Sequence, residues 1–421
     1  MQNTGMPLVS EGVQRRLLAT LFSAQSIYNA AQVVSFTVTT LAAVALTGSE
    51  ASAGLPATIT LAGRAVVAYP IGWLMDRLGR RNTIALGFLL SVVGTVLSAL
   101  AFPARSFALF CVGSLINGFG RGTGEQSRYA AADIVPPARA SQAIGTLVFA
   151  GTVGAVLGPL LIAPAERFAG ARGFDALAGP YVISAALTFV SLIVIFVFLR
   201  PDPGLISRRR EAASPQPSAE SRSLRHIFSM PAVQLAVIAL GVCQLVMTMI
   251  MVITPLHMQH EQHATESIAW VIMAHTLGMF GLSGITGRLT ARFGNSPIIF
   301  WGGMILALSA VLAPMAATVP LLAVALFLLG LGWNLAYVAG SALLASSVSS
   351  GERGRTQGAS ETLIAVAAAS ASFGTGIAFD WGGLIAVSMI GLALTLALFA
   401  ALFWARKQPV PVVGGETNPA I

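Results

Sequence analysis

Charged residues are scarce in this sequence. Only 10% of its 421 residues are Asp, Glu, Lys or Arg, and its mean hydropathy is +0.79. A soluble domain carries roughly a quarter charged residues, so this composition excludes one. Cysteine is scarcer still, because Cys111 and Cys243 are the only two and both lie within apolar stretches. We expect them to be small buried hydrophobic residues and not a disulfide.

Several functional classes lack the residues that they need. The net charge of +8 does not indicate nucleic-acid binding, because the basic residues form short clusters between apolar runs and no basic domain exists. No GxxxxGK[ST] phosphate loop is present, so ATP-driven transport has no local support. Nor is a hydrolytic constellation visible. We therefore expect no enzyme activity and no cofactor.

Long apolar runs dominate the chain. A helix needs ~20 apolar residues to span a bilayer, and helices are expected because strands would leave backbone groups unpaired in lipid. The predicted spans are 17–45, 53–75, 82–103, 107–134, 141–164, 178–199, 230–255, 267–290, 297–317, 320–348, 356–379 and 383–404. The first run begins near Leu17 and is too long for a cleavable signal. The prediction is an all-α integral membrane protein with twelve transmembrane helices.

A polar, basic stretch divides these spans into two sets of six. It contains Arg208, Arg209 and Arg210, and we expect it to be a solvated linker. The predicted domains are an N-terminal six-helix bundle at 1–200, a basic linker at 201–229, a C-terminal six-helix bundle at 230–405 and a tail at 406–421. Most arginines fall on one side of the spans, which places both termini and the linker in the cytoplasm.

One short basic hairpin occurs twice. The first hairpin, Gly72–Arg81, reads Gly-Trp-Leu-Met-Asp-Arg-Leu-Gly-Arg-Arg. The second hairpin, Gly287–Ser296, has nearly the same spacing 215 residues later, with Ala291 in place of Asp76. A charged turn between membrane-length helices, used twice at one offset, indicates a duplicated membrane protein.

Together, the twelve spans, the central linker and the first hairpin resemble the major facilitator superfamily, and most closely its bacterial drug and metabolite:proton transporters. The resemblance implies two pseudo-symmetric six-helix bundles in the bacterial inner membrane, surrounded by lipid and acting as a monomer. It also implies a cytoplasmic gate that latches the two halves together. The gate residues would be Gly72, Asp76, Arg77, Gly79, Arg80, Arg81, Asp133 and Arg292. A purely topogenic turn, and for Asp133 a solvated helix-end acid, are the alternatives.

The fifth span contains a partial antiporter motif, Gly154-x-x-x-Gly158-Pro159. The motif of drug/proton exporters continues with Gly-Gly, where this chain has Ile162-Ala163. Ser114 stands near the position of the fourth-span arginine that is common in proton-coupled exporters. An export motif and a small-residue packing face both stay open.

Four charged residues stand out within the predicted spans. Arg64 lies twelve residues from Asp76, ~18 Å along a helix, which is close to the middle of a ~30 Å hydrocarbon core. Arg121, Glu125 and Arg128 share one helix face by spacing, and Arg121 is the simplest partner for Glu125. Three roles stay open: a surplus arginine that binds an anionic substrate, Glu125 as a proton carrier, and a buried ion network that fixes two helices together.

Polar residues on other spans predict a central binding site. In the family, spans one, four, seven and ten line the substrate path. The candidate substrate-binding residues are Gln25, Tyr28, Asn29, Gln32, Arg64, Arg121, Arg128, Gln244, Trp333, Asn334 and Tyr337. Each of these polar residues has the alternative role of bonding a neighbouring helix.

The proton-coupling candidates are Glu125, His275 and Glu361. His275 has a helix-bridging hydrogen bond as its alternative role, and Glu361 has a place at the membrane interface or beside the gate arginines. Three further histidines, His257, His260 and His263, match no compact ligand spacing, so we predict no metal site.

These patterns predict a secondary transporter that works by alternating access, with protons and a small organic molecule as its partners. The surplus of arginine favours an anionic, amphipathic or zwitterionic solute. Export is the preferred direction because of the partial fifth-span motif. Proton-coupled uptake of a metabolite or vitamin is the alternative, and a sensor that transports nothing is the least favoured.

Overall fold

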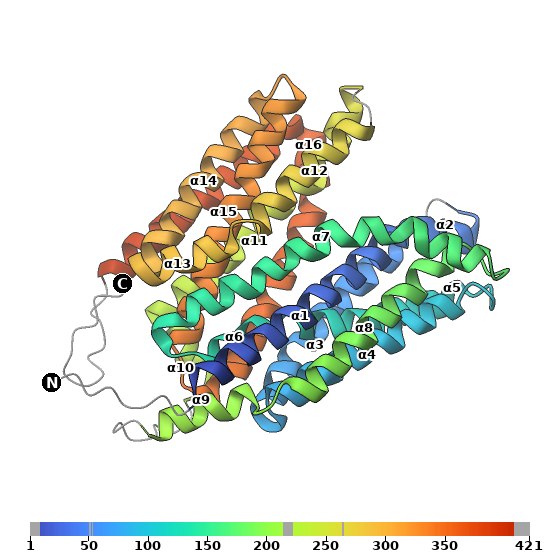
Figure 1. Cartoon of the computed structure of the whole chain (residues 1–421). Helices are drawn as coiled ribbons and strands as arrows, with labels where there is room; N and C mark the ends of the chain where they lie inside the picture. The colour runs from blue at the N-terminus through green and yellow to red at the C-terminus, as the bar shows by residue number, and fades with distance from the viewer. Residues whose placement is uncertain (1–8, 50–51, 53, 214–221, 263–264, 408–421) are drawn as a thin grey trace. The chain divides into compact units, whose positions relative to one another are not determined.

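The structure is a computed structural model that describes residues 9–407 except 50–51, 53, 214–221 and 263–264. Every regular element among these residues is a helix (Figure 1), as the sequence predicts. The chain divides into two compact units. Unit 1 comprises Met1–Pro136, Ala150–Ser218 and Ser349–Thr362, and unit 2 comprises Pro137–Phe149, Ala219–Val348 and Leu363–Ile421.

Unit 1 is built around five long helices that pack on one another (Figure 1). Helix α4 packs against both α5 and α8, α3 packs on α5, and α1 packs on α8. The helices of this unit are α1 (Glu11–Thr37), α2 (Thr39–Thr47), α3 (Leu55–Leu78), α4 (Arg80–Leu100), α5 (Phe107–Glu125), α6 (Ser127–Ile134), α8 (Ala178–Phe198) and α9 (Pro203–Ala212).

Unit 2 is centred on α15, which packs on α11, α12 and α14 and is the most buried of the apolar helices. Its helices are η2 (Pro137–Arg139), α10 (Leu224–Ser229), α11 (Pro231–His260), α12 (Thr265–Phe280), α13 (Ser283–Phe293), α14 (Asn295–Met315) and α15 (Val319–Ser346). Two helices contribute to both units, namely α7 (Ala140–Gly170) and α16 (Ser350–Lys407).

The predicted spans differ from the observed helices mainly where a helix breaks or two spans are joined. Among the described residues, eight helices are long and apolar enough to cross a membrane, or nine if the bent pair α1 and α2 forms one span. Three predicted spans are each divided into two helices, because the helix breaks at Val38, at Gln126 and at Gly281–Leu282. The last two predicted spans form the single element α16, whose backbone is non-helical at Gly382 and Gly383.

Large apolar side chains cover much of the outer surface. In unit 1, Val66 and Leu160 are 69% and 67% exposed. Such exposure would be unfavourable in water but is the normal state of a lipid-facing residue, because lipid tails are as apolar as the side chains. The chain is therefore a multi-pass membrane protein.

The segment that was predicted to be a solvated linker is partly helical and partly buried. It contains the helix α9, which buries Pro203, Ile206 and Ser207 against unit 1 and begins with an Asp202 side chain that accepts the Gly204 N–H. The segment from Pro203 to Ala212 is thus part of the folded unit and not a solvated connection. Residues 214–221 of the linker and 408–421 of the tail lie outside the described residues.

Candidate substrate and gate sites

Three of the predicted midplane charges meet in unit 1. Arg64 Nη2 lies 2.6 Å from Glu125 Oε2, whereas Arg121 Nε lies 3.8 Å from Glu125 Oε1. The closer partner of Glu125 is therefore Arg64 from α3, and not Arg121 from the same helix as the sequence suggested. One carboxylate faces two guanidinium groups, so this set of three carries one surplus positive charge.

A close helix crossing explains this pairing. A Cβ atom on Gly118 of α5 would lie 2.3 Å from the backbone oxygen of Thr60, and one on Gly63 of α3 would lie 2.6 Å from that of Leu115. Only glycine permits the two backbones to approach this far. Arg64 follows Gly63 directly, so the crossing brings its side chain within reach of Glu125.

Arg121 is the more exposed guanidinium of this set and the one farther from Glu125. Its side chain is 30% exposed, against 14% for Arg64. Its Cζ lies 5.4 Å from the centre of the Phe36 ring. The surplus charge therefore resides mainly on Arg121.

Arg128 belongs to a different ion pair. Helix α5 ends at Glu125 and α6 begins at Ser127, so the predicted continuous face through 121, 125 and 128 is interrupted. The Arg128 guanidinium pairs with Glu361 from the start of α16, and both side chains are 4% exposed. Its Nη1 and Nη2 also donate to the Glu125 backbone oxygen and the Tyr129 hydroxyl. Arg128 is therefore neutralised, and Glu361 is a buried carboxylate away from the gate arginines.

Amide side chains form a ladder along α1. Gln25 Nε2 donates to Asn29 Oδ1 at 3.2 Å, and Gln25 Oε1 accepts the Ser127 hydroxyl at 2.8 Å. Gln32 and Asn117 exchange hydrogen bonds of 3.2 and 3.4 Å. The sequence analysis missed Asn117, although its position one turn before Arg121 on α5 was a usable signal.

Tyr28 does not belong to this ladder. Its ring is 2% exposed and stacks on Phe88 at 4.4 Å, and its hydroxyl lies 2.9 Å from the Ser91 hydroxyl. A residue next to Asn29 lies about 100° around the helix, so it faces α4 instead. The predicted substrate role of Tyr28 is corrected to helix packing.

An aromatic pair with an amide lies in unit 2. The Trp333 and Tyr337 rings of α15 stack with centroids 4.3 Å apart and planes 18° apart. Trp333 Nε1 donates to Gln244 Oε1 at 3.2 Å, and Gln244 Nε2 donates to the Thr248 hydroxyl at 3.2 Å. These three predicted residues therefore form one set.

Asn334 is separate from that set, although it lies next to Trp333 in sequence. It is fully buried, accepts the Thr286 hydroxyl at 2.6 Å, and donates to the Ser283 hydroxyl and the Met279 backbone oxygen. These bonds hold α15 against α12 and α13. Its predicted substrate role is therefore replaced by a structural one.

His275 makes the helix-bridging bond that was its alternative role. Its Nδ1 lies 3.0 Å from the Leu326 backbone oxygen, so Nδ1 carries the proton and donates. The ring is 2% exposed, and Nε2 has no hydrogen-bond partner among the described residues. The imidazole in this arrangement is neutral, with one acceptor nitrogen left over.

The first hairpin turns at Gly79. Its φ of +85° is a left-handed conformation that favours glycine, and it precedes the first residue of α4. The carboxylate of Asp202 accepts the backbone N–H groups of Arg80 at 3.2 Å and Arg81 at 2.8 Å. Asp202 therefore caps α4 and α9 together, a role that the sequence analysis did not assign.

A buried carboxylate joins two arginines beside this turn. Asp133 is 2% exposed, accepts Arg80 Nε at 2.9 Å on one oxygen and Arg353 Nη1 at 2.8 Å on the other. Arg80 also donates to Gln357. The structure thus brings Asp133 together with one of the predicted gate arginines. Charge-assisted bonds to both oxygens satisfy a carboxylate that burial would otherwise destabilise.

The start of α16 packs directly on the end of α3. The Asp76 carboxylate accepts the backbone N–H groups of Gly354 and Arg355, both at 2.9 Å. A Cβ atom on Gly72 would lie 2.1 Å from the Gly354 oxygen and 2.9 Å from the Gly358 Cα. The spacing Gly354-x-x-x-Gly358 is a small-residue pattern that could have predicted this contact from the sequence.

Three predicted gate residues lie outside this network. Arg77 is exposed and stacks over Trp73 at 4.0 Å, and Arg292 is exposed and lies 5.3 Å from the Phe293 ring. Arg81 donates to the Phe196 backbone oxygen at 3.1 and 2.8 Å. These three side chains contact their own helices or the end of α8, and their place in the gate stays a prediction.

Helix α9 ties the elements of this region together. Arg208 donates to the Asp76 backbone oxygen, and Arg210 donates to those of Val135 and Ile134 at the end of α6. Glu211 accepts the Ser350 N–H at 2.7 Å and its hydroxyl at 2.7 Å. The basic linker helix therefore caps carbonyl groups at two helix ends and its acid caps the start of α16.

The glycines of the partial antiporter motif pack on α1. A Cβ atom on Gly154 would lie 2.6 Å from the Asn29 Cβ, and one on Gly158 would lie 2.5 Å from Val33 Cγ1. A close helix contact therefore accounts for both residues.

Among the described residues, no group of three or more His, Cys, Asp or Glu side chains could hold a metal ion.

Comparisons with known proteins agree with this architecture. The family profile described as Major Facilitator Superfamily matches residues 17–245 and 236–419. The uncharacterized MFS-type transporter YdeG of Bacillus subtilis (strain 168) is 32% identical over 406 residues, 96% of this chain and 94% of that protein. The riboflavin transporter RfnT of Brucella anthropi is 30% identical over 367 residues, 86% of this chain and 88% of that protein.

The solved structures show the same fold. The crystal structure of the major facilitator superfamily transporter FucP in the outward conformation has a TM-score of 0.74 at 17% identity, covering 92% of this chain and 97% of that one. The relatives and the fold are those of transporters and not of enzymes. Helical membrane architecture, family profile and full-length relatives together show that this chain belongs to the major facilitator superfamily.

Proposed function

We propose that the protein is a proton-coupled secondary transporter of a small organic solute with an anionic group, and that Arg121 binds that group. The observation that carries the proposal is the unequal sharing of Glu125, which lies 2.6 Å from Arg64 but 3.8 Å from Arg121. Arg128 is already paired with Glu361. Arg121 is thus the guanidinium that lies farther from Glu125 and is more exposed to a ligand.

The neighbouring side chains suit an amphipathic or zwitterionic anion. A guanidinium group binds carboxylate or phosphate through two parallel N–H donors. The amides of Gln25, Asn29, Gln32 and Asn117 offer donors and acceptors to a polar edge. Within unit 2 taken by itself, the predicted substrate-binding residues Trp333 and Tyr337 stack and offer a flat apolar surface.

Glu125 is the proposed proton carrier, and its position favours symport. When Glu125 binds a proton, the negative charge beside Arg121 disappears and the site attracts an anion more strongly. Because linkage is reciprocal, a bound anion also favours proton binding at Glu125. A proton and an anion that help each other bind move together, which favours proton-driven uptake.

Because the proton and the anion favour each other's binding, uptake replaces export as the preferred direction of transport. The sequence analysis favoured export because of Gly154-x-x-x-Gly158-Pro159, but helix packing on α1 already accounts for both glycines. Uptake of a vitamin or similar metabolite is therefore the first candidate, and the relative named riboflavin transporter supports it. Export remains the second candidate, with the Pro159-containing motif of α7 as its support.

The remaining elements complete the proposal. The chain works as a monomer by alternating access in the bacterial inner membrane, with both termini and α9 in the cytoplasm. The contacts of Asp76 and Asp133 with the start of α16 form in one state and break in another. His275 and Glu361 are further proton-coupling candidates, since each has a buried atom without a hydrogen-bond partner among the described residues.

The test begins with metabolite profiles, inside and outside, of cells with and without the gene. Purified protein in liposomes is then given the compounds that change, together with riboflavin and its 5′-phosphate as probes. With the outside made acidic, we expect accumulation inside. Arg121→Gln should reduce uptake at least tenfold, and the exposed Arg167→Gln, which also removes one positive charge, should leave it unchanged.

Glu125→Gln separates coupling from binding. This variant should still exchange solute down its own gradient but should no longer accumulate it against one. Ligand binding without transport by the wild-type protein would reject the transporter proposal. Unchanged proton-driven accumulation by the Glu125→Gln variant would remove Glu125 from the mechanism, and unchanged affinity in Arg121→Gln would remove Arg121 from the site.

A further inference from the structure

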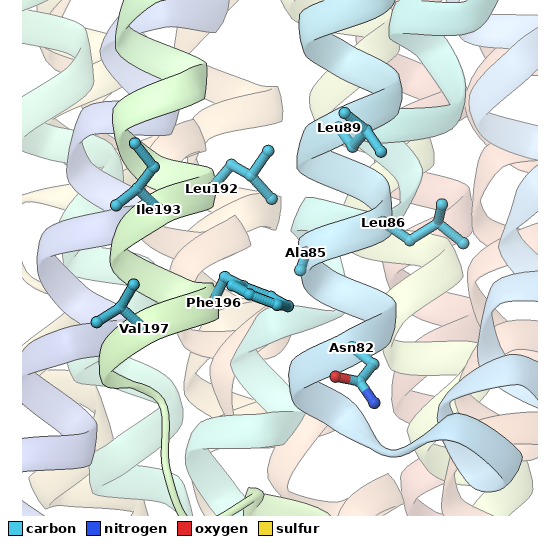
Figure 2. A pocket seen from close by; sticks show the side chains of 8 residues that line it. All are labelled: Asn82, Ala85, Leu86, Leu89, Leu192, Ile193, Phe196 and Val197. Carbon is cyan, nitrogen blue, oxygen red and sulfur yellow. The ribbon is translucent and has the colours of Figure 1, made fainter.

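A second site of unit 1 lies on its outer surface, between α4 and α8 (Figure 2). It is an open groove of about 500 Å³ whose walls include Ala85 and Leu89 on α4 and Leu192 and Phe196 on α8. Leu89 and Phe196 are about half exposed, so the groove opens away from the bundle. Asn82 is the one polar residue among those that line it.

The position of the groove along the helices is informative. Its lining on α4 extends from Asn82 to Leu89, which is ~10 Å of helix. On α4 the lining starts two residues after the first residue of the helix. On α8 the lining comes from the last turns. The groove therefore runs from the basic end of the helices across about two thirds of one leaflet, whose hydrocarbon is half of a ~30 Å core.

A basic group lies at the mouth of the groove. The Arg81 Cζ is 4.8 Å from the centre of the Phe196 ring, which forms part of the groove wall. Arg81 Nε and Nη2 both donate to the Phe196 backbone oxygen. Within the described part of the chain, Nη1 donates no hydrogen bond, so this nitrogen keeps its donors for a group outside the bundle.

We infer that the groove binds one acyl chain of an anionic phospholipid, and that the lipid phosphate accepts hydrogen bonds from Arg81 Nη1. The apolar walls position the chain but cannot select a lipid, because every lipid tail is as apolar as Leu. Selection comes from the charge at the mouth. In the proposed orientation that mouth faces the cytoplasmic leaflet, where anionic lipids attract basic residues.

The expected affinity preference for anionic lipid follows from the single arginine at the mouth of the groove. A basic residue near the membrane surface contributes about a fivefold preference for anionic over zwitterionic lipid at physiological salt. The preference should weaken when salt screens the phosphate, because Arg81 is not fully buried. The bound chain also covers Phe196, the residue whose backbone holds Arg81 next to the gate turn.

Native mass spectrometry of the full chain in mild detergent tests this inference. The probes are phosphatidylglycerol and phosphatidylcholine with identical chains, each titrated alone and in competition. We expect one bound phosphatidylglycerol with about fivefold tighter affinity than phosphatidylcholine, and a smaller difference at high salt. Ala85→Phe fills the groove and should abolish the preference. Val93→Phe, on the exposed face of α4 beyond the groove, is the matched control and should retain it.

Two further measurements keep the inference falsifiable. If Ala85→Phe fails to fold, Leu192→Trp blocks the same groove from α8. Soluble sn-glycerol 3-phosphate distinguishes a lipid site from a free phosphate site, and we expect it not to displace the lipid. Equal affinities for the two lipids, an unchanged preference in the groove-filling variants, or full displacement by glycerol phosphate would each overturn the inference.

Discussion

The first and second hairpins have the same backbone. Gly79 has φ and ψ of 85° and 168° before α4, and Gly294 has 87° and 170° before α14. Each hairpin also packs against another helix through a glycine that lies seven residues, about two helix turns, before the turn glycine. Gly72 meets Gly354 at the start of α16 in unit 1, and Gly287 meets Ser141 at the start of α7 in unit 2.

The charges differ where the backbones agree. Asp76 accepts two backbone N–H groups of α16, whereas Ala291 at the matching position is exposed and has no acceptor. The buried Asp133 binds two arginines, and the same offset of 215 residues leads to the buried Val348. In unit 2 the Ser141 hydroxyl donates to the Gly287 oxygen in place of a charge network. The turn and its glycine contact are thus the repeated part, and the ion network is specific to unit 1.

The largest effect should come from the centre of that network. Asp133→Ala leaves the buried Arg80 without the carboxylate that it pairs with and takes one carboxylate from Arg353, which costs roughly 3–5 kcal/mol for a broken buried pair. We expect a large fall in the midpoint of thermal unfolding in detergent, and loss of transport. The comparison variant in the second hairpin is Arg292→Gln, whose exposed side chain should contribute no more than about 0.5 kcal/mol.

Double substitution sharpens the comparison. Asp133→Ala combined with Arg80→Met should recover part of the lost stability, because it removes the buried guanidinium that Asp133→Ala leaves without its carboxylate. If Asp133→Ala unfolds at the wild-type temperature, or if Arg292→Gln lowers the midpoint equally, the two hairpins do not differ in the way that their contacts indicate.

The sequence predicted the fold through patterns that each helix carries by itself. Apolar runs, basic turns and the repeated hairpin were enough for an all-α membrane protein of this family, and the profile match and relatives confirm it. The predicted pairing of Asp133 with a gate arginine also agrees with the 2.9 Å contact to Arg80. Its role in gating stays a prediction.

The sequence could not predict which helix each face would meet. Spacing along α1 placed Tyr28 near Gln25, but α4 supplies its partners. The Arg64–Glu125 pair depends on a glycine crossing between α3 and α5, which no periodicity within one helix reveals. The break at Gln126 likewise redirects Arg128 to Glu361. These are tertiary contacts, and they decide the charge balance at Arg121.

An intermediate effect should follow from the shared glycine contact. The Cβ atom of Gly72→Ala would lie 2.1 Å from a backbone oxygen, and that of Gly287→Ala 2.6 Å from one. Backbone cannot move aside as a side chain does, so each variant should lose about 1–3 kcal/mol by overpacking, with Gly72→Ala the more damaging. Thermal unfolding and transport rate in liposomes measure both.

A control for these variants lies one turn from Gly287. A Cβ atom on Gly284 would meet nothing within 4 Å. Gly284→Ala should therefore be neutral or stabilise α13 by up to about 1 kcal/mol through helix propensity. Equal losses at Gly284 and Gly287 would show that helix propensity and not close packing governs this region.

The smallest effect should come from the charge of Asp76 alone. Asp76→Asn replaces one of the two carboxylate oxygens that accept the Gly354 and Arg355 N–H groups by an amide NH2 and removes the charge that strengthens the remaining bond, a change of roughly 1 kcal/mol. We expect transport to fall several-fold with little change in unfolding temperature, because the contact stabilises one state relative to another. Ala291→Asn introduces the same side chain at an exposed position of the second hairpin and should leave transport unchanged. Equal rates in the two variants would mean that the asymmetry between the hairpins has no part in gating.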